Sequence, residues 1–308
     1  MTSPWTLHPE PGDRRCCIRF SAMASPCEIW VEGAPPSLWQ TLARTASDEA
    51  LRIEQKWSRY RNDNLMHRIN SANGAVVEVD DETARLLDYG GTLFDASEGR
   101  FDLTAGVLRR AWRFDGSSSL PDAMQVRALL RQVGWQRVDW SRPRLRMPPG
   151  MELDLGGIGK EYAVDRTLAL LQTQTDAALL VNYGGDLAAN RPPADDTPWR
   201  VGIGEIGVRT AGTPLIRLQR GGIATSGSAN RFVMAGGVRY GHVLDARTGW
   251  PAPEAPLAVT VAAATCSQAG SLSTLAMLTG ADAEHFLAEQ GVDFHVLRPS
   301  APHPGDPR

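Results

Sequence analysis

The segment LDLGGIGKEYAVDR, residues 153–166, joins a run of glycines to a lysine, an acid and then a helical pattern. A glycine turn between a strand and a helix lets backbone N–H groups and the helix N-terminus face an anion at close range. Lys160 adds a compact positive charge to this turn, and Lys56 is the only other lysine in the chain. These residue types predict a site for a phosphate or pyrophosphate. The alternative is a tight strand–helix connection in which glycine serves packing alone.

The segment does not match the two common nucleotide-binding fingerprints. In a Walker A loop, G-x-x-x-x-G-K-[ST], the position of the first glycine is Asp154 here and the final Ser or Thr is Glu161. The Rossmann pattern G-x-G-x-x-G does not occur in the segment either. If the turn binds an anion, it must do so in another way.

Three more glycine bends carry polar residues. LVNYGGDLAAN places Asp186 just after a Gly-Gly turn, and EGRFDLTAGVLRRAW puts Asp102 and Thr104 into a bend. Gly-Gly turns also close many ordinary hairpins. Ser226 in IATSGSANRF lacks a G-x-S-x-G frame and a His/Asp pair, so we interpret its segment as a turn.

YGHVLDARTGWP, residues 240–251, holds two candidate acid–base groups. His242 and Asp245 are three apart on a predicted strand, so they would face opposite sides unless the strand bends. The alternative for a lone histidine is a structural hydrogen bond. The six histidines show no pair at metal-ligand spacing, and a zinc site is not expected.

Composition limits the class of partner. The formal net charge is −3 and no block of Lys or Arg occurs, so we expect no nucleic-acid partner and no membrane surface as the main partner. No apolar run reaches the about 18 residues of a transmembrane helix. The four cysteines lack CxxC or Cys/His spacing and the N-terminus lacks an apolar signal segment, which predicts reduced thiols and a cytoplasmic location.

Hydrophobic periodicity places these residues on an alternation of helices and strands. The predicted helices cover residues 38–57, 81–97, 120–135, 158–173 and 268–290. The predicted strands cover residues 26–33, 75–79, 144–147, 151–155, 177–182, 199–205, 214–219, 222–226, 231–235, 240–246 and 255–265. Short glycine-containing turns join many of the strands, which indicates an α+β fold with mostly antiparallel sheet and helices packed between and outside the strands.

We expect a single domain at residues 23–298, because no repeat and no Pro/Ser linker divides this range. Residues 1–22 are predicted to form an N-terminal arm that is partly disordered. The Pro-rich residues 299–308 are predicted to form a disordered tail.

Taken in order, these stretches resemble the ApbE family, the FAD:protein FMN transferases. The matching pieces are MASPCEIWV, WSRYRNDNLMHRIN, GRFDLTAGVLRRAWRF, LDLGGIGKEYAVDR, LLVNYGGDL, IATSG and HVLDARTGWP, within residues 23–298. The resemblance implies an ApbE-like α-β roll that binds FAD. It also implies that Mg²⁺ assists transfer of the FMN half to a Ser or Thr of an acceptor protein, with release of AMP.

The resemblance also implies roles for single residues. The residues it assigns to FAD contact are Met23, Tyr60, Phe101, Asp102, Leu103, Asp154, Lys160 and Leu244. Lys160 would steady the pyrophosphate, while His242 or Asp245 would position groups at the phosphorus or take the acceptor proton. This agrees with the chemistry of FAD, since a pyrophosphate suits a glycine turn with a cation and a flavin ring suits an apolar wall.

The metal site departs from the family pattern. Where the family has an Asp that binds Mg²⁺, this sequence has Gly270, which leaves the Gly157 carbonyl, Ser273 and Thr274 as expected protein ligands. Glu161 replaces a glycine that usually follows the lysine. Because an acid is lost at position 270 and one is gained at 161, our hypothesis is that Glu161 reaches the metal, directly or through water.

Three functions therefore remain open. The first is FMN transfer from FAD to an acceptor hydroxyl. The second is an FAD-binding protein that has lost transfer together with the metal acid, which Gly270 favours. The third is an FAD pyrophosphatase, in which water replaces the acceptor hydroxyl. Retention of Asp154, Lys160, Thr274 and the HVLD segment favours the first.

Overall fold

An eight-stranded sheet forms the centre of the protein in a computed structural model that describes residues 4–12, 14–193, 197–202, 215–227 and 231–299. The strand order is β1-β2-β3-β7-β8-β11-β14-β15, and every pair of neighbours is antiparallel. The strands are β1 (Trp5–Pro9), β2 (Arg15–Ala22), β3 (Ser25–Glu32), β7 (Ala178–Tyr183), β8 (Asp186–Ala189), β11 (Gly221–Gly227), β14 (Ala258–Ala263) and β15 (Asp293–Leu297). The predicted α+β class with mostly antiparallel sheet is confirmed.

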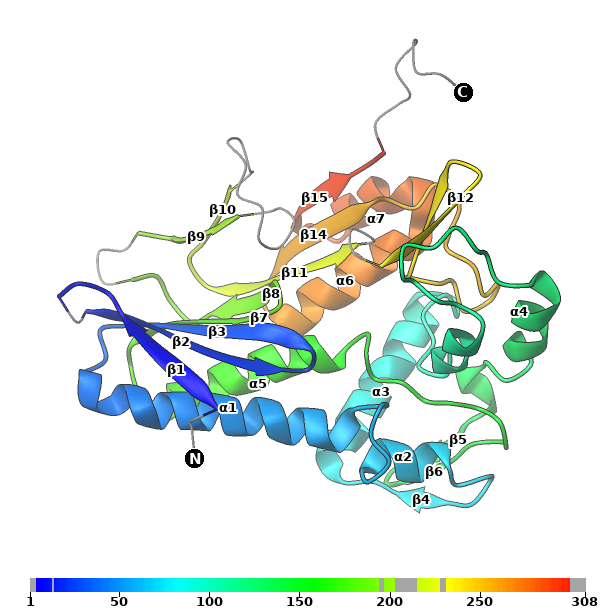
Figure 1. The fold of residues 1–308 in the computed structure, drawn as a ribbon, viewed down its shortest axis with the longest axis horizontal. Helices are drawn as coiled ribbons and strands as arrows, with labels where there is room; N and C mark the ends of the chain where they lie inside the picture. The colour runs from blue at the N-terminus through cyan, green and yellow to red at the C-terminus, as the bar shows by residue number, and fades with distance from the viewer. Residues whose placement is uncertain (1–3, 13, 194–196, 203–214, 228–230, 300–308) are drawn as a thin grey trace, which may run out of the picture.

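Three helices pack closely together beside this sheet (Figure 1). They are α1 (Pro36–Trp57), α5 (Gly159–Gln172) and α6 (Cys266–Thr279). The spacing of apolar residues at 38, 42, 46, 50, 53 and 57 predicts one buried stripe on this helix. In α1 the stripe is buried from Leu42 to Trp57, while Leu38 at its beginning is half-buried. Helix α5 contacts α1, α6, β7 and β8, while α6 lies on β11 and β14. Helix α5 is thereby held between the sheet and two other helices.

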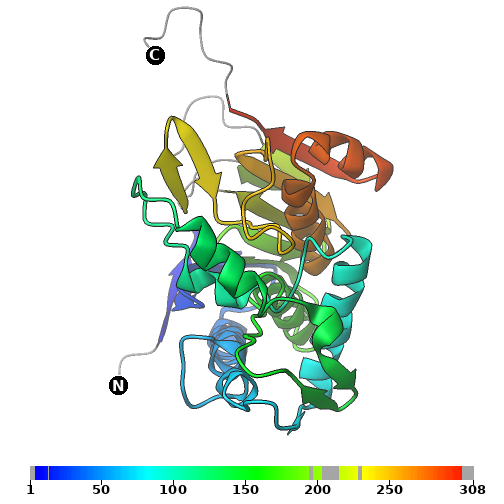
Figure 2. The ribbon, with the colours of Figure 1, turned by 90° about the vertical axis from the view of Figure 1, so that its right-hand side faces the viewer.

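The remaining elements complete the described part of the chain. The helices are α2 (Leu65–Asn70), α3 (Asp81–Ala96), α4 (Ala123–Leu130) and α7 (Ala283–Glu289), with 3-10 turns at Gly106–Arg110, Trp135–Arg137 and Gly280–Asp282. The strands are β4 (Val77–Glu78), β5 (Asp139–Ser141), β6 (Arg144–Arg146), β9 (Trp199–Gly202), β10 (Leu215–Leu218), β12 (Phe232–Ala235) and β13 (Val238–Gly241). Figure 2 shows the β12–β13 hairpin beside the α4 region, where Val233 packs on Leu108 and Trp112.

The predicted N-terminal arm is wrong for most of its length. Strands β1 and β2 belong to the central sheet, and β2 pairs with β3 along its whole length. Cys16 and Ile18 are fully buried. The alternation of apolar and polar residues in this short segment matches a half-buried strand, but its partner strands could not be identified locally. The predicted tail from residue 300 onward, and parts of the predicted strands at 199–205 and 214–219, lie outside the described residues. The strand predicted at 231–235 is present as β12.

Other predicted elements are shorter or broken in the structure. The helix predicted at 268–290 is interrupted at Gly280, whose φ of +65° ends α6. Residues 151–155 form no ladder beyond one bridge at Glu152, because Asn70 bonds both backbone groups of Leu153 instead. The strand predicted at 240–246 ends at Gly241. Within the described residues, no helix combines the length and the apolar character needed to cross a bilayer.

Candidate functional site

Lys160, the second residue of α5, forms an ion pair with Asp186 at the start of β8. The Nζ–Oδ2 distance is 2.5 Å, and only 5% of the Asp186 side chain is exposed. Its other oxygen accepts a hydrogen bond of 3.2 Å from the Thr225 backbone N–H on β11. Burial opposes the charge on Lys160, but the pairing with Asp186 outweighs it and raises the lysine pKa. Lys160 therefore carries a positive charge at neutral pH.

The glycine turn between β7 and β8 brings a third segment to this ion pair. Gly184 and Gly185 have φ values of +63° and +101°, which favour glycine. A Cβ on Gly184 would lie 2.8 Å from Ser25 Oγ and 3.9 Å from Lys160 Nζ. The β2–β3 turn, which includes Met23, thus meets the start of α5, and the Met23 N–H donates to Glu54 on α1.

Asp154 lies at the beginning of the glycine run. One carboxylate oxygen pairs with Arg59, and the other accepts a hydrogen bond of 2.9 Å from the Gly156 N–H. Arg59 also lies over the ring of Tyr60, whose side chain is 78% exposed. The Arg59–Asp154 pair fixes the turn, and Tyr60 is an aromatic face open to solvent beside it.

In the Phe101-Asp102-Leu103 bend, the first side chain is half-buried and the other two are buried. Phe101 is half-buried and lies against Gly157. The Asp102 carboxylate accepts hydrogen bonds from the Thr104 N–H and hydroxyl, both at 2.7 Å, and from the Trp135 N–H at 2.8 Å. Leu103 is 2% exposed and packs beneath Gly90. The side chains of Asp102 and Leu103 are therefore committed to the interior, so these residues can offer a ligand little besides their main chain.

His242 follows β13 and borders an aromatic cluster of Trp112, Phe114, Tyr240 and Trp250. Burial, together with the positive charges on Arg231 and Lys160, lowers the pKa of His242 to about 4. Its buried Nδ1 has no hydrogen-bond partner among the described residues. His242 is therefore a neutral imidazole at pH 7, and the positive charge on Lys160 contributes to keeping it neutral.

Asp245 has a different role from His242. Its buried carboxylate accepts hydrogen bonds from the Arg247 backbone N–H at 2.9 Å and from the Arg247 guanidinium at 2.8 Å. Its backbone N–H and C=O bond to Trp250 and Gly249, which closes the turn. The two residues do not share a strand, since β13 ends at Gly241, and Leu244 between them packs into the cluster around Trp112. Asp245 shapes the turn that follows His242.

Three hydroxyl groups meet between β11 and α6. Ser226 Oγ lies 2.8 Å from Ser273 Oγ and 2.9 Å from Thr274 Oγ1. Ser273 also donates to the Gly270 carbonyl at 3.0 Å. Ser226 is the neighbour of Thr225, which bonds Asp186. The two hydroxyls expected to bind a metal are thus brought together, one turn of α6 beyond Gly270.

Glu161 fills the space beside Gly270. A Cβ built on Gly270 would lie 2.5 Å from Glu161 Cγ and 2.9 Å from its Oε1. The Glu161 side chain is buried, and its Oε2 has no hydrogen-bond partner among the described residues. Burial, with a further contribution from the Asp186 charge, raises the pKa of Glu161 to about 8. The carboxyl group gained at position 161 therefore occupies the space into which a side chain at position 270 would point.

These groups suit a hard divalent cation by donor type. Hydroxyl, carboxylate and carbonyl oxygens are the ligands that Mg²⁺ prefers. In the described part of the chain, no three His, Cys, Asp or Glu side chains form a metal-binding group. A cation here would need hydroxyls, water or a bound phosphate besides Glu161, whose unpaired Oε2 provides a vacant donor position. Gly157, the expected carbonyl ligand, lies against Phe101.

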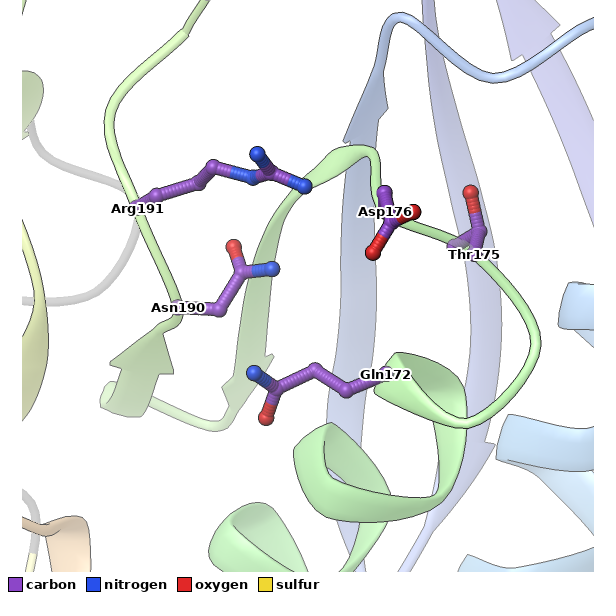
Figure 3. Close-up of a pocket in the computed structure, with 5 residues that line it drawn as sticks. All are labelled: Gln172, Thr175, Asp176, Asn190 and Arg191. Carbon is purple, nitrogen blue, oxygen red and sulfur yellow. The ribbon is translucent and has the colours of Figure 1, made fainter.

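A polar hollow on the surface lies away from this site. Gln172, Thr175, Asp176, Asn190 and Arg191 line it (Figure 3). Gln172 is the last residue of α5, so this hollow is at the opposite end of the helix from Lys160. It holds none of the predicted site residues.

Sequence reasoning missed or undervalued several residues of the site. Asp165 accepts hydrogen bonds of 2.8 Å from the Cys266 and Ser267 N–H groups and so caps α6. Its spacing of four from Glu161, on one face of α5, was the available signal. Ser226, interpreted as a turn residue, instead bonds the two α6 hydroxyls. Asp186, noted only as a turn residue, is the partner of Lys160.

Comparisons with known proteins agree on one family. The sequence model of the ApbE family matches residues 23–296. The FAD:protein FMN transferase of Klebsiella pneumoniae is 27% identical over 251 residues, which are 78% of this chain and 72% of that protein. The FAD:protein FMN transferase of Salmonella typhimurium is 28% identical, with the same two coverages.

Solved structures show the same likeness. The ApbE protein of Thermotoga maritima superposes with a TM-score of 0.80 at 29% identity, covering 91% of this chain and 93% of that one. The flavinyl transferase ApbE of Pseudomonas stutzeri, in its apo form, superposes with a TM-score of 0.81 at 24% identity, covering 96% and 92%. At 24% identity, the second superposition shows only that the two chains share a fold.

Proposed function

The chain belongs to the ApbE family, and on this premise we propose that it is an FAD:protein FMN transferase. It transfers the FMN half of FAD to a Ser or Thr hydroxyl of an acceptor protein and releases AMP. The observation that carries the proposal is the Lys160–Asp186 ion pair, held where the start of α5 meets the Gly184-Gly185 turn. This arrangement offers a fixed cation to a pyrophosphate.

The reaction is a displacement at the FMN phosphorus. The acceptor oxygen forms a bond to that phosphorus, while the bond from the phosphorus to the bridging oxygen breaks and its electron pair leaves with AMP. The ammonium group of Lys160 stabilises negative charge on the pyrophosphate oxygens as it shifts toward the leaving group. Asp186 acts through Lys160, because its nearly buried carboxylate keeps the ammonium charged and in place.

His242 is our candidate for the proton acceptor. Its imidazole is neutral at pH 7, so it can take the proton of the acceptor hydroxyl. The negative charge of a bound pyrophosphate would raise its lowered pKa and strengthen it as a base. Asp245 is less suited to this step, because Arg247 already holds its carboxylate.

FAD itself would contact residues from five segments. Met23 and Asp154 border the glycine turns, and the exposed ring of Tyr60 and the half-buried ring of Phe101 offer apolar faces to a flavin or adenine ring. Contacts by Asp102 and Leu103 would come from the main chain. Leu244 would contribute through its place beside His242.

A Mg²⁺ ion would be held by the hydroxyls of Ser273 and Thr274 and by the Gly157 carbonyl, together with the substrate. When bound, it would neutralise charge on the pyrophosphate as the phosphorus–oxygen bond breaks. The two hydroxyls meet at Ser226, which orients both.

The test follows AMP and covalent flavin together. The purified protein is incubated with FAD and Mg²⁺, with Ser- and Thr-containing acceptor peptides or with matched peptides in which Ala replaces the hydroxyl residue. We expect AMP and peptide-bound flavin only with the hydroxyl peptides, and neither with Lys160→Met. AMP without covalent flavin would identify a pyrophosphatase. FAD binding without AMP would identify a binding protein that has lost transfer.

A further inference from the structure

Gly270 lacks a side chain at a point where Glu161 occupies the space. The atom nearest to a Cβ at 270 is Glu161 Cγ at 2.5 Å, followed by Oε1 at 2.9 Å and Cδ at 3.0 Å. Real Cβ atoms do not approach other atoms this closely, so residue 270 cannot carry a side chain while Glu161 keeps its position. The Glu161 carboxyl group therefore lies where a short side chain from position 270 would point.

Hydroxyl groups of α6 and β11 lie close to Gly270, the residue against which the Glu161 side chain packs. Thr274 is four residues beyond Gly270 on the same face of α6, and helical side chains lean toward the N-terminus, which brings its hydroxyl back toward residue 270. Ser273 Oγ is bonded to the Gly270 carbonyl at 3.0 Å. Ser226 Oγ, on β11, contacts both hydroxyls. Oxygen donors from α5, α6 and β11 thus gather around one backbone position.

Among the described residues, Glu161 is the acid of this neighbourhood that has a buried carboxyl oxygen without a hydrogen-bond partner. Asp165 is used by the N–H groups at the start of α6, and Asp186 is used by Lys160 and Thr225. Glu161 has 9% of its surface exposed, and its Oε2 has no partner among the described residues. A buried carboxyl oxygen without a partner costs free energy, which a ligand at this point would recover.

The local charge favours a cation as that ligand. The charges of Asp186 and Asp165 act on Glu161, and the charge of Lys160 opposes them. Three carboxylates and one ammonium ion leave two excess negative charges when all are ionised, and a divalent cation neutralises them. Carboxylate and hydroxyl oxygens without a thiolate or imidazole select a hard ion such as Mg²⁺ or Mn²⁺.

We propose that Glu161 is the carboxylate ligand of a divalent-cation site that it forms with the hydroxyls of Ser273 and Thr274. The identity of the cation and its pyrophosphate partner rest on the proposed function. The carboxylate comes from α5 instead of α6, so the same helix turn supplies Lys160 to the pyrophosphate and Glu161 to the metal. The metal ligand Glu161 and the pyrophosphate-binding Lys160 are then adjacent in sequence.

The test measures Mn²⁺ binding directly. Mn²⁺ is titrated into the metal-free protein, alone and with ADP as a pyrophosphate probe, and free Mn²⁺ is followed by electron paramagnetic resonance. Glu161→Gln keeps the size of the side chain and removes its charge. Glu49→Gln is the matched control, because Glu49 is another buried glutamate whose oxygens already pair with Arg52 and Arg166.

We expect Glu161→Gln to weaken Mn²⁺ binding by about ten-fold or more, since loss even of a group that only orients a ligand costs about 10–100-fold. Glu49→Gln should bind Mn²⁺ as the unaltered protein does. The double variant Glu161→Ala/Gly270→Asp should recover most of the affinity, because its new carboxylate points from position 270 into the vacated space. Thermal unfolding of each variant checks that it is folded.

Two outcomes would overturn the inference. One is that the unaltered protein binds no Mn²⁺ under either condition. The other is that Glu161→Gln binds it as tightly as the unaltered protein, which would leave Glu161 as a space-filling or proton-carrying group. AMP release from FAD is measured separately, so the two proposals can fail independently. If the unaltered protein releases AMP with Mg²⁺ and Glu161→Gln still binds Mn²⁺ normally, Glu161 is not a metal ligand but the proposed transferase function stands. If Mn²⁺ binding depends on Glu161 but the unaltered protein releases no AMP, Glu161 is a metal ligand and the proposed transferase function fails.

Discussion

Substitution of Gly270 by alanine should change the stability of the protein in opposite directions, depending on the residue at position 161. Gly270 lies inside α6, where replacing Gly by Ala stabilises a helix by about 1 kcal/mol when space allows. Here the added Cβ would lie 2.5 Å from Glu161 Cγ. Overpacking of this kind costs about 1–3 kcal/mol. The single variant should therefore range from about neutral to 2 kcal/mol less stable.

Glu161→Ala removes each of the three atoms that the new Cβ would meet, namely Cγ, Cδ and Oε1. In that background the helix preference acts alone, and Gly270→Ala should stabilise by about 1 kcal/mol. The coupling free energy between the two positions is then about 1–3 kcal/mol. This coupling does not depend on what Glu161→Ala costs alone, because that cost cancels in the double-mutant cycle.

The four proteins of the cycle are compared by urea unfolding, followed by far-UV circular dichroism, in buffer with a chelator so that metal binding does not contribute. The slope of the unfolding free energy with urea should be similar in all four. If Gly270→Ala stabilises by about 1 kcal/mol with and without Glu161, the coupling is absent. In that case the Glu161 side chain does not occupy the space beside Gly270, and Glu161 does not take the place of an acid at position 270.

Three further predictions concern other parts of the site. Lys160→Met should lower the rate of AMP release by about 100-fold or more, which a product assay measures. It should also lower the free energy of unfolding, measured with urea, because Asp186 stays buried without its partner. Asp102→Asn should cost about 1–3 kcal/mol of unfolding free energy, since its carboxylate accepts three hydrogen bonds; unchanged stability would contradict this. His242 binds its proton near pH 6.5 when unfolded and near 4 when folded, so stability should fall as pH drops through this window. His242→Gln should flatten that slope.

Much of the fold follows from local patterns. The stripe of apolar residues in α1 and the glycine turns before α5 and β8 lie where periodicity and turn chemistry predicted them. Errors arose where long-range pairing decides the structure. Strands β1 and β2 are ordered by pairing with each other and with β3. Residues 151–155 are extended but bonded by Asn70, which no local pattern encodes.

The amino-acid sequence by itself determined which chemical groups the protein has and the order in which they occur. The glycine run before Lys160 and the order of the motifs were sufficient to identify the family. Only the tertiary structure decided which groups meet. It pairs Lys160 with Asp186, buries Asp102 and places Glu161 against Gly270. The physical reason is that turn geometry and helical periodicity act over a few residues, whereas burial and ion pairing depend on elements that are distant in sequence.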